Sequence, residues 1–248
     1  MDIKIAAQLI IDSRRVTAFT GAGISVESGI PPFRGKVGLW SKYDPMILDL
    51  NYYINNHEES WPIIKKLFFD FFGNAKPNKA HRILANWEEK GFINDIITQN
   101  IDSLHQKAGS KTVYEFHGTS ESFICTKCFF KYKISDIDLT NTTPICIECS
   151  GLLKPDFIFF GEEIPSLAYK KSVLAAQKSD LFILVGTTGE ILPASQIPVL
   201  AKQNNCKIIE VNTNHSNFSH SITDIFLQGK ATEVFERLDK EIKSLLTK

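Results

Sequence analysis

Short apolar runs that end in polar residues recur along this chain of 248 residues, and they constrain its fold more than any other feature. Segments with helical spacing of apolar residues separate the runs. About six short strands that alternate with helices predict an α/β fold with a doubly wound parallel sheet and helices on both faces. The expected strands span residues 16–19, 92–97, 113–116, 157–160, 180–186 and 207–211, with a short edge strand at 226–229.

A glycine turn follows the first of these strands directly. Gly21-Ala22-Gly23 and the short helical segment after it, residues 24–28, form the arrangement that presents backbone N–H groups to a phosphate. Glycine suits this position because a Cβ would block the anion or forbid the φ angle of the turn. The turn lacks the full G-x-G-x-x-G pattern, so an ordinary turn is the alternative interpretation. Phe33 and Arg34 come next, which suggests a loop that folds over a bound ligand.

Polar side chains also follow the second and third strands. Thr98-Gln99-Asn100-Ile101-Asp102 comes after residues 92–97, and His117 comes after residues 113–116. Ligands of open parallel sheets bind outside the carboxyl ends of the strands, so this cluster and the glycine turn are candidates for one site. Helix capping by Asn and Asp is an alternative role, compatible with the first. His117 is a candidate general base by its position, whereas a lone histidine more often has a structural role.

Four of the five cysteines form two C-x-x-C pairs with 17 residues between them. This spacing is typical of a structural zinc site, in which about 15–20 residues separate the pairs. Cys125, Cys128, Cys146 and Cys149 would supply four thiolates to one tetrahedral ion, which leaves no open position for a catalytic water. Redox-active thiols are the alternative. The fifth cysteine, Cys206, lies in an apolar context and is expected to be buried.

Phenylalanine is concentrated at residues 68–72, where it fills four of five positions. We expect a helix from about residue 60 to residue 72 here. Packing in the core is one explanation of these aromatic residues, and the apolar wall of a ligand channel is the other.

The bulk composition excludes several classes of partner. The 28 basic and 28 acidic residues give a formal net charge of +0, so no global field draws the chain to nucleic acid or to an anionic membrane. No apolar run approaches the ~20 residues of a membrane span, and the N-terminus lacks the order of a signal peptide. An odd number of cysteines without such a signal indicates a reducing compartment, so we expect a cytoplasmic protein.

In their order along the chain, these motifs resemble those of the sirtuin family over roughly residues 5–245. Sirtuins are NAD-dependent protein lysine deacylases, which release nicotinamide and O-acyl-ADP-ribose. The matching motifs are Gly21-Ala22-Gly23-Ile24-Ser25, Gly29-Ile30-Pro31 with Phe33-Arg34-Gly35, Thr98-Gln99-Asn100-Ile101-Asp102, His117-Gly118, the two cysteine pairs, Phe160-Gly161-Glu162, Gly186-Thr187-Thr188 and Asn212.

The resemblance implies a single catalytic domain, residues 1–248, with two small insertions in a Rossmann-type part. The Rossmann-like part would span about residues 1–35, 77–122 and 154–248, and the insertions would be a helical one at 36–76 and a zinc-ribbon module at 123–153. NAD would be the co-substrate and a single Zn²⁺ ion a structural component. An acylated-lysine protein or peptide would meet NAD in the cleft between the two parts. The sequence gives no prediction of the oligomeric state.

The resemblance also implies a role for each motif. His117 would be the general base that takes a proton from a ribose hydroxyl, Asn100 would place a water or a ribose hydroxyl, and Asp102 would orient the nicotinamide amide. NAD would be bound by Gly21, Ala22, Gly23, Ile30, Phe33, Arg34, Gln99, Asn100, Ile101, Asp102, Gly186, Thr187, Thr188 and Asn212. The substrate peptide would add as a strand between residues 160–163 and 189–191, in contact with Phe160, Gly161, Glu162, Gly189, Glu190 and Ile191.

The chain departs from the family pattern at two positions. Pro32 stands where many relatives have Asp, which is expected to change the stiffness of the loop, and Gly189 stands where many have Leu, which is expected to loosen the peptide site. The Tyr-x-x-Arg pair of succinyl- and malonyl-selective relatives is absent, and the corresponding residues 65–72 are mostly apolar. This favours acetyl or a longer apolar acyl group.

Two other functions remain open at this stage. An ADP-ribosyltransferase or NAD glycohydrolase would use the same NAD pocket without the peptide cleft, and the matching motif at residues 160–162 favours the deacylase over both. A non-enzymatic NAD sensor or scaffold would not need His117, Asn100 and Asp102 together.

Overall fold

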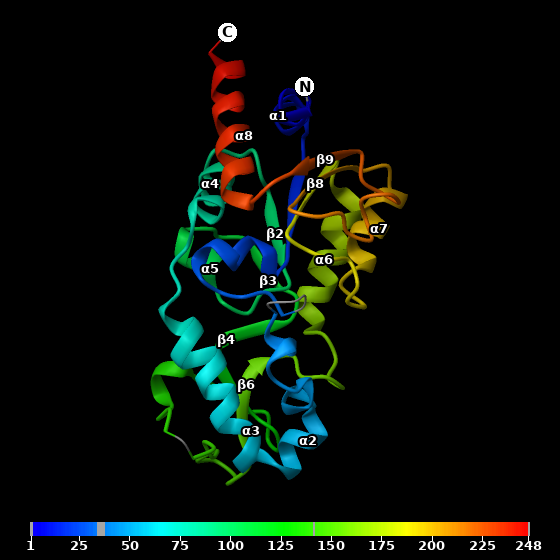
Figure 1. Ribbon diagram of the computed structural model, residues 1–248. Coiled ribbons are helices and arrows are strands. Elements are labelled where there is room, and N and C mark those ends of the chain that lie inside the picture. Colours follow the sequence, from blue (N-terminus) through cyan, green and yellow to red (C-terminus); the bar gives the residue numbers. More distant parts are fainter. Residues whose placement is uncertain (1, 34–37, 141, 248) are drawn as a thin grey trace.

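The computed structural model describes residues 2–33, 38–140 and 142–247. The chain forms two bodies, an upper one and a lower one in Figure 1, with both chain ends at the far end of the upper body. The upper body is built around a sheet of six strands, and the lower body around a sheet of three.

The upper sheet is parallel throughout, in the order β3-β2-β1-β7-β8-β9. Counted within this sheet, that is the 3-2-1-4-5-6 order of the Rossmann fold, which confirms the expected doubly wound sheet. β1, β2 and β7 are buried along their whole length, as expected for strands covered on both faces. The strands are β1 Val16–Thr20, β2 Asp95–Thr98, β3 Val113–Glu115, β7 Leu181–Val185, β8 Lys207–Asn212 and β9 Ile225–Gln228.

Helices cover both faces of the upper sheet (Figure 1). α1, α4 and α8 pack over a largely aliphatic core on one face, and α6 and α7 pack over the other. In the described part of the chain, no helix is long and apolar enough to cross a membrane. The helices are α1 Asp2–Asp12, α4 Lys79–Glu89, α5 Leu104–Ala108, α6 Ser166–Lys178, α7 Gln196–Gln203 and α8 Ala231–Leu246, with the 3-10 helix η1 at Ala22–Ser28.

The lower body joins two segments that are far apart in the sequence. One is helical, and the other carries an antiparallel sheet of order β5-β4-β6 together with the cysteine pairs. Aromatic side chains of both segments form one core, and Trp61 Nε1 donates a hydrogen bond to Thr140 O at 3.0 Å across them. The elements are α2 Leu50–Asn55, α3 His57–Ile64, β4 Gly118–Cys125, β5 Lys131–Lys133 and β6 Leu153–Phe157. They are joined by the π-helix η4 Lys65–Phe71 and by the short 3-10 helices η2 Leu39–Ser41, η3 Pro45–Leu48, η5 Phe72–Asn74 and η6 Ile134–Asp136.

Two expected elements differ from the structure. The strand expected at 157–160 in the main sheet is β6, which ends at Phe157 and pairs with β4 in the lower body. It lies there because Phe157 and Phe159 pack into the aromatic core of that body. The helix expected from about residue 60 begins at His57 and winds as a π-helix in η4. The wider winding brings neighbouring phenylalanines into the core, which a period of 3.6 residues does not predict.

Candidate active site

The glycine turn lies at the switch point of the upper sheet, between the carboxyl ends of β1 and β7. Gly23 N–H donates to Gly186 O at 2.9 Å. A Cβ on Gly21 or Gly23 would lie 2.8 or 2.5 Å from backbone atoms of Gly186. Glycine is therefore also required by the contact between two backbone turns. Ala22 lies between the two glycines and begins η1.

Ser25 joins the glycine turn to the polar cluster that follows β2. Its hydroxyl donates to Asp102 Oδ2 at 2.7 Å and accepts from Asn100 Nδ2 at 3.1 Å. Leu104 N–H, at the first residue of α5, donates to the other carboxylate oxygen of Asp102 at 2.9 Å, although the N-cap residue itself is Ser103. Burial raises the pKa of Asp102, and these hydrogen bonds oppose the rise. Ser25 is fully buried and was missed as a site residue, although it belongs to the glycine-rich motif.

Hydrogen bonds also link the ends of β2, β7 and β8. Gln99 Nε2 donates to Thr187 Oγ1 at 3.1 Å, and Asn212 Nδ2 donates to Thr187 O at 2.9 Å. Thr188 is exposed, and its carbonyl accepts from Asn217 N–H at 3.0 Å. Residues predicted from separate strand ends are thus joined by hydrogen bonds.

Three residues of the predicted NAD site have apolar side chains. Ile30 and Ile101 are buried, and the Phe33 ring lies 5.6 Å from that of Trp40 and 6.3 Å from that of Phe68, centroid to centroid. The predicted NAD contact Arg34 lies outside the described residues.

His117 lies between β3 and β4, where the chain passes from the upper body to the lower one. Its Nδ1 is 3.1 Å from Gln99 O. A carbonyl oxygen only accepts, so Nδ1 carries the proton and Nε2 keeps a lone pair, for which the described residues provide no partner. Burial lowers the pKa of His117, and the bond to Gln99 opposes this. The imidazole is therefore neutral at pH 7 and suited to act as a base.

Two further histidines form a pair beneath the strand ends, and the sequence did not indicate this pair. The rings of His81 and His105 are fully buried, with their centroids 4.9 Å apart. His81 Nδ1 accepts from Asn78 N–H as part of the capping box of α4, and His105 Nε2 lies 2.9 Å from Thr20 Oγ1. Burial lowers the pKa of His81 to about 4 and that of His105 well below its ordinary value.

The four paired cysteines come together in the lower body, with all four Sγ atoms within 4.8 Å of one another. Cys125 and Cys149 Sγ are 3.5 Å apart, and Cys128 and Cys146 Sγ are 3.6 Å apart. Tetrahedral zinc with Zn–S bonds of about 2.3 Å places its sulfur ligands about 3.8 Å apart. The thiols therefore fit one Zn²⁺ ion as predicted. Cys206 is buried in the other body, at the start of β8.

The two predicted peptide segments are anchored in different bodies. Phe160 exchanges backbone hydrogen bonds with Leu48 and Leu50, at 2.7 and 3.1 Å, and its side chain is half-exposed. Gly189 has φ +74°, and a Cβ there would lie 2.9 Å from the ring of Phe218. Glycine at this position allows the Phe218 ring to pack against the segment. Glu190 and Ile191 follow directly.

A cavity of about 170 Å³ adjoins the polar cluster, between the two bodies. Ile101 and Asp102 line it on one side, and Phe68, Phe69 and Phe72 line it on another. The same three phenylalanines are buried in the core of the lower body. Both explanations of the aromatic cluster, core packing and the wall of a cavity, therefore apply.

The donor set at the strand ends fits NAD. A dinucleotide requires hydrogen-bond partners for its ribose hydroxyls and carboxamide, and apolar surface beside its nicotinamide ring. Ser25, Gln99, Asn100 and Asp102 provide hydroxyl, amide and carboxyl groups, with the apolar Ile101 between them. The switch point of a Rossmann sheet is the place where dinucleotides bind.

Comparison with known proteins agrees with this geometry. A family model described as the Sir2 family matches residues 21–193. The chain is 38% identical over 247 residues to NAD-dependent protein deacetylase 1 of Pyrobaculum aerophilum, covering 99% of this chain and 96% of that one. It is 40% identical over 241 residues to NAD-dependent protein deacylase 2 of the same organism, covering 97% and 96%. A solved structure of Sir2 with a p53 peptide and NAD⁺ superposes with a TM-score of 0.89 at 35% identity, covering 97% and 98%.

Proposed function

The chain belongs to the Sir2 family, and we propose that it is an NAD-dependent protein lysine deacylase that acts on acetyl-lysine. The observation that carries the proposal is the contact between His117 and the NAD-binding strand ends. His117 donates from Nδ1 to Gln99 O, and Gln99 donates to Thr187. A neutral base is thereby fixed next to amide and hydroxyl groups that suit a dinucleotide. The products would be free lysine, nicotinamide and O-acyl-ADP-ribose.

NAD, when bound, supplies the ribose that takes the acyl group, with nicotinamide as the leaving group. The switch-point residues would hold its adenosine and diphosphate parts, and the apolar border would exclude water from the reacting end. The first set is Gly21, Ala22, Gly23, Gly186, Thr187, Thr188 and Asn212, with Arg34 from the segment outside the described residues. The second set is Ile30, Phe33 and Ile101.

His117 would take a proton from a ribose hydroxyl through Nε2. Its lowered pKa keeps this nitrogen unprotonated at neutral pH, and the bond from Nδ1 to Gln99 O holds the ring in place. Asn100 and Asp102 would contact the nicotinamide ribose and the carboxamide. Ser25 would orient both of them, since it bonds to each.

The substrate peptide would bind as an added strand between residues 160–163 and 189–191. In support of this, the backbone N–H groups of Gly161 and Glu163 have no acceptor among the described residues. Free N–H groups beside a cleft are what strand addition requires.

An apolar acyl group is the second part of the proposal. The cavity beside Ile101 is lined by Phe68, Phe69 and Phe72 and would accept a chain longer than acetyl. Lys107 at the same cavity is within 2.7 Å of Glu121, so its charge is already paired. These features favour apolar over acidic acyl groups.

The same proposal includes three further predictions from the sequence. These are the domain boundaries, a cytoplasmic location and acyl-lysine proteins as partners. The family relationship supports the acyl-lysine partners, and the contact of the helical segment with the cysteine segment supports treating residues 36–76 and 123–153 as one unit.

The test is a product assay by mass spectrometry. Purified protein is incubated with NAD and with acetyl-, succinyl- and myristoyl-lysine peptides of one sequence. We expect NAD-dependent removal of acetyl or myristoyl, with one O-acyl-ADP-ribose for each acyl group lost and little reaction of succinyl. Nicotinamide release without deacylation of any peptide would contradict the proposal and indicate an NAD glycohydrolase or an ADP-ribosyltransferase.

A further inference from the structure

Lys154 is a charged side chain buried in the lower body, and no step of the proposed reaction uses it. It lies on β6, and its side chain is 5% exposed. Lysine is almost never buried to this extent unless its ammonium group is fully paired. Its surroundings therefore indicate why the fold tolerates it.

Each of the three ammonium protons of Lys154 has an acceptor. Nζ donates to Pro155 O at 2.9 Å and to Phe157 O at 2.8 Å, and it forms an ion pair with Glu162 Oε2 at 2.9 Å. The same ammonium lies 4.6 Å from the centroid of the Phe159 ring. Burial lowers the pKa of Lys154, whereas Glu162 opposes this. The group thus joins the end of β6 to a carboxylate further along the chain.

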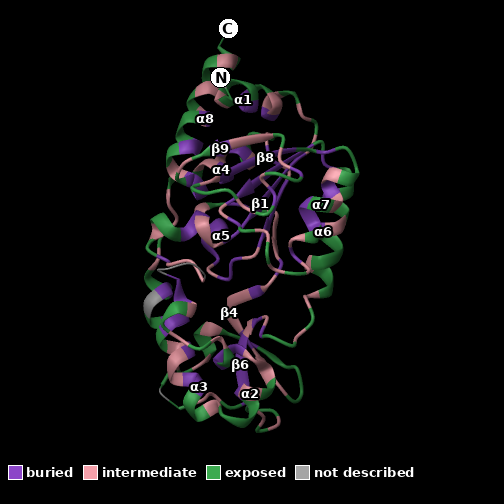
Figure 2. Cartoon of the chain, turned by 45° about the vertical axis from the view of Figure 1, so that its right-hand side comes forward, coloured by how far each residue is buried: buried purple, intermediate pink, exposed green. Residues whose placement is uncertain are grey.

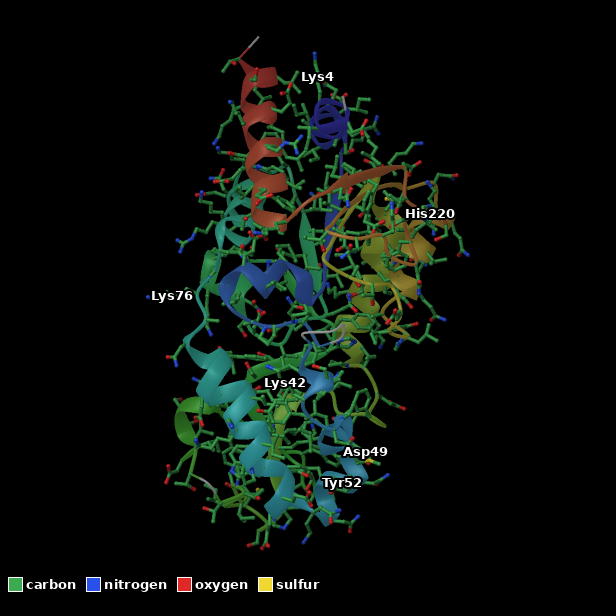
Figure 3. All side chains as sticks on the ribbon, in the orientation of Figure 1. Lys4, Lys42, Asp49, Tyr52, Lys76 and His220 are labelled. Carbon is green, nitrogen blue, oxygen red and sulfur yellow. The ribbon has the colours of Figure 1, made fainter. Side chains whose placement is uncertain are left out.

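Glu162 in turn closes the turn that precedes the free N–H groups. Its Oε2 accepts from Phe159 N–H at 2.6 Å, and its own N–H donates to Phe159 O at 3.1 Å. Gly161, at the centre of the turn, has φ +91°. On its outer side the turn is held by the bridge of Phe160 to the segment at Asp49, which lies beside Tyr52 in the lower body (Figure 3).

We propose that Lys154 is a positioning residue for the substrate peptide, because its ion pair with Glu162 holds residues 159–163 in the shape that offers the N–H groups of Gly161 and Glu163 to an added strand. This rests on the proposed function. In this proposal Lys154 does not contact the peptide. It acts on peptide binding only through the shape of residues 159–163. Without the Lys154 ammonium group, Glu162, whose side chain is only 20% exposed, would lose its counter-ion. The turn would then be released.

The test compares two substitutions with a matched control. Lys154→Met removes the ammonium and keeps the length of the side chain, and Glu162→Gln keeps an acceptor for Phe159 N–H but removes the charge. Lys131→Met is the control, because Lys131 pairs with Asp156 in the same sheet but is 63% exposed. We expect the KM for an acetyl-lysine peptide to rise about tenfold in Lys154→Met and about threefold in Glu162→Gln. The kcat, the KM for NAD and all constants of the control are expected to stay within about twofold.

Hydrogen exchange of the backbone provides the second measurement, and it does not depend on activity. Amides of residues 159–163 are expected to exchange faster in both variants than in wild type or control, with no change at the strands of the upper sheet. An equal change of kcat and both KM values, or unchanged exchange at 159–163, would overturn the proposal. If Lys154→Met fails to fold, Glu162→Gln decides by the same criteria. If wild type neither binds nor deacylates the peptide, the proposed function fails, and the exchange rates still decide the role of Lys154.

Discussion

The two bodies of the molecule are stabilised by different means. The upper body buries aliphatic side chains on both faces of a six-stranded parallel sheet, and its central strands form a continuous buried layer (Figure 2). The lower body has a sheet of three strands, an aromatic core and a four-cysteine cluster. A zinc ion bound by the four cysteines would provide this small body with an additional cross-link. The predicted polar site residues lie at the carboxyl edge of the upper sheet, and a cavity between the two bodies adjoins them.

The largest difference between the two bodies is expected when one cysteine in each is replaced by serine. Cys146→Ser removes one of four zinc ligands, and binding of structural zinc contributes about 10 kcal/mol or more to the folding of such modules. We expect loss of zinc, loss of aromatic near-UV circular dichroism from the lower body and loss of deacylation.

Cys206→Ser is the matched change in the upper body, where the thiol is buried and lies outside the four-cysteine cluster. We expect full zinc content and a loss of about 1 kcal/mol in the free energy of unfolding. Zinc content is measured by mass spectrometry of the metal, and stability by urea denaturation. A folded, active and zinc-free Cys146→Ser variant would contradict the account of the lower body.

The second largest effect concerns the residue between the two bodies. His117→Ala is expected to lower kcat by about 10²–10⁴ because the general base is lost, with little change in NAD affinity. His220→Ala is the control, since this histidine is exposed on the upper body (Figure 3). Steady-state kinetics and calorimetric NAD titration measure the two quantities. Activity of His117→Ala within a few-fold of wild type would exclude the general-base role.

The comparison also shows how far the sequence could predict the molecule. Alternating strands and helices predicted the upper sheet, and polar residues at strand ends predicted the meeting of Gln99 with Thr187. The zinc site was predictable because both cysteine pairs are local in sequence. By contrast, β6 was assigned to the wrong sheet, because its apolar residues do not reveal which of two cores they enter.

The sequence also could not predict which side chains from different strand ends contact one another. Ser25 bonds to Asp102, and His81 meets His105, across distances in sequence that no local pattern spans. The sequence also could not reveal the contact of Gly23 with Gly186, since it depends on two loops that meet only in the folded chain.

A pH-dependent loss of stability is expected for the upper body, and it is intermediate in size. Burial lowers the pKa of His81 from 6.5 to about 4 in the folded chain. Between these values the unfolded chain binds a proton that the folded chain does not, so stability is complete above about pH 6.5 and falls as the pH approaches 4. At 1.36 kcal/mol per pKa unit, the loss from His81 is about 3 kcal/mol.

Urea denaturation at several pH values between 7 and 4.5 tests this expectation. Zinc release at low pH is common to all variants, so the difference in slope between wild type and His81→Gln isolates the histidine. His220→Gln is the control for the substitution itself, because this histidine is exposed. An identical slope for His81→Gln would contradict the assigned burial effect.

The smallest effect compares a glycine from each body. Gly189→Ala is expected to cost about 1–2 kcal/mol, because φ is +74° and the new Cβ would lie 2.9 Å from the ring of Phe218. Gly73→Ala in the lower body meets nothing within 4 Å and has an ordinary φ. That change is expected to stay within about 0.5 kcal/mol. Thermal denaturation distinguishes the two, and equal melting temperatures would contradict the packing assigned to Phe218.

The central claim is that the upper body holds NAD and the lower body brings the acyl peptide to it, in one coupled site. The most direct measurement is the rate of nicotinamide release by wild type with and without an acetyl-lysine peptide. The account predicts that release requires the peptide and that one nicotinamide appears for each acetyl group removed. Release at the same rate without peptide would contradict it.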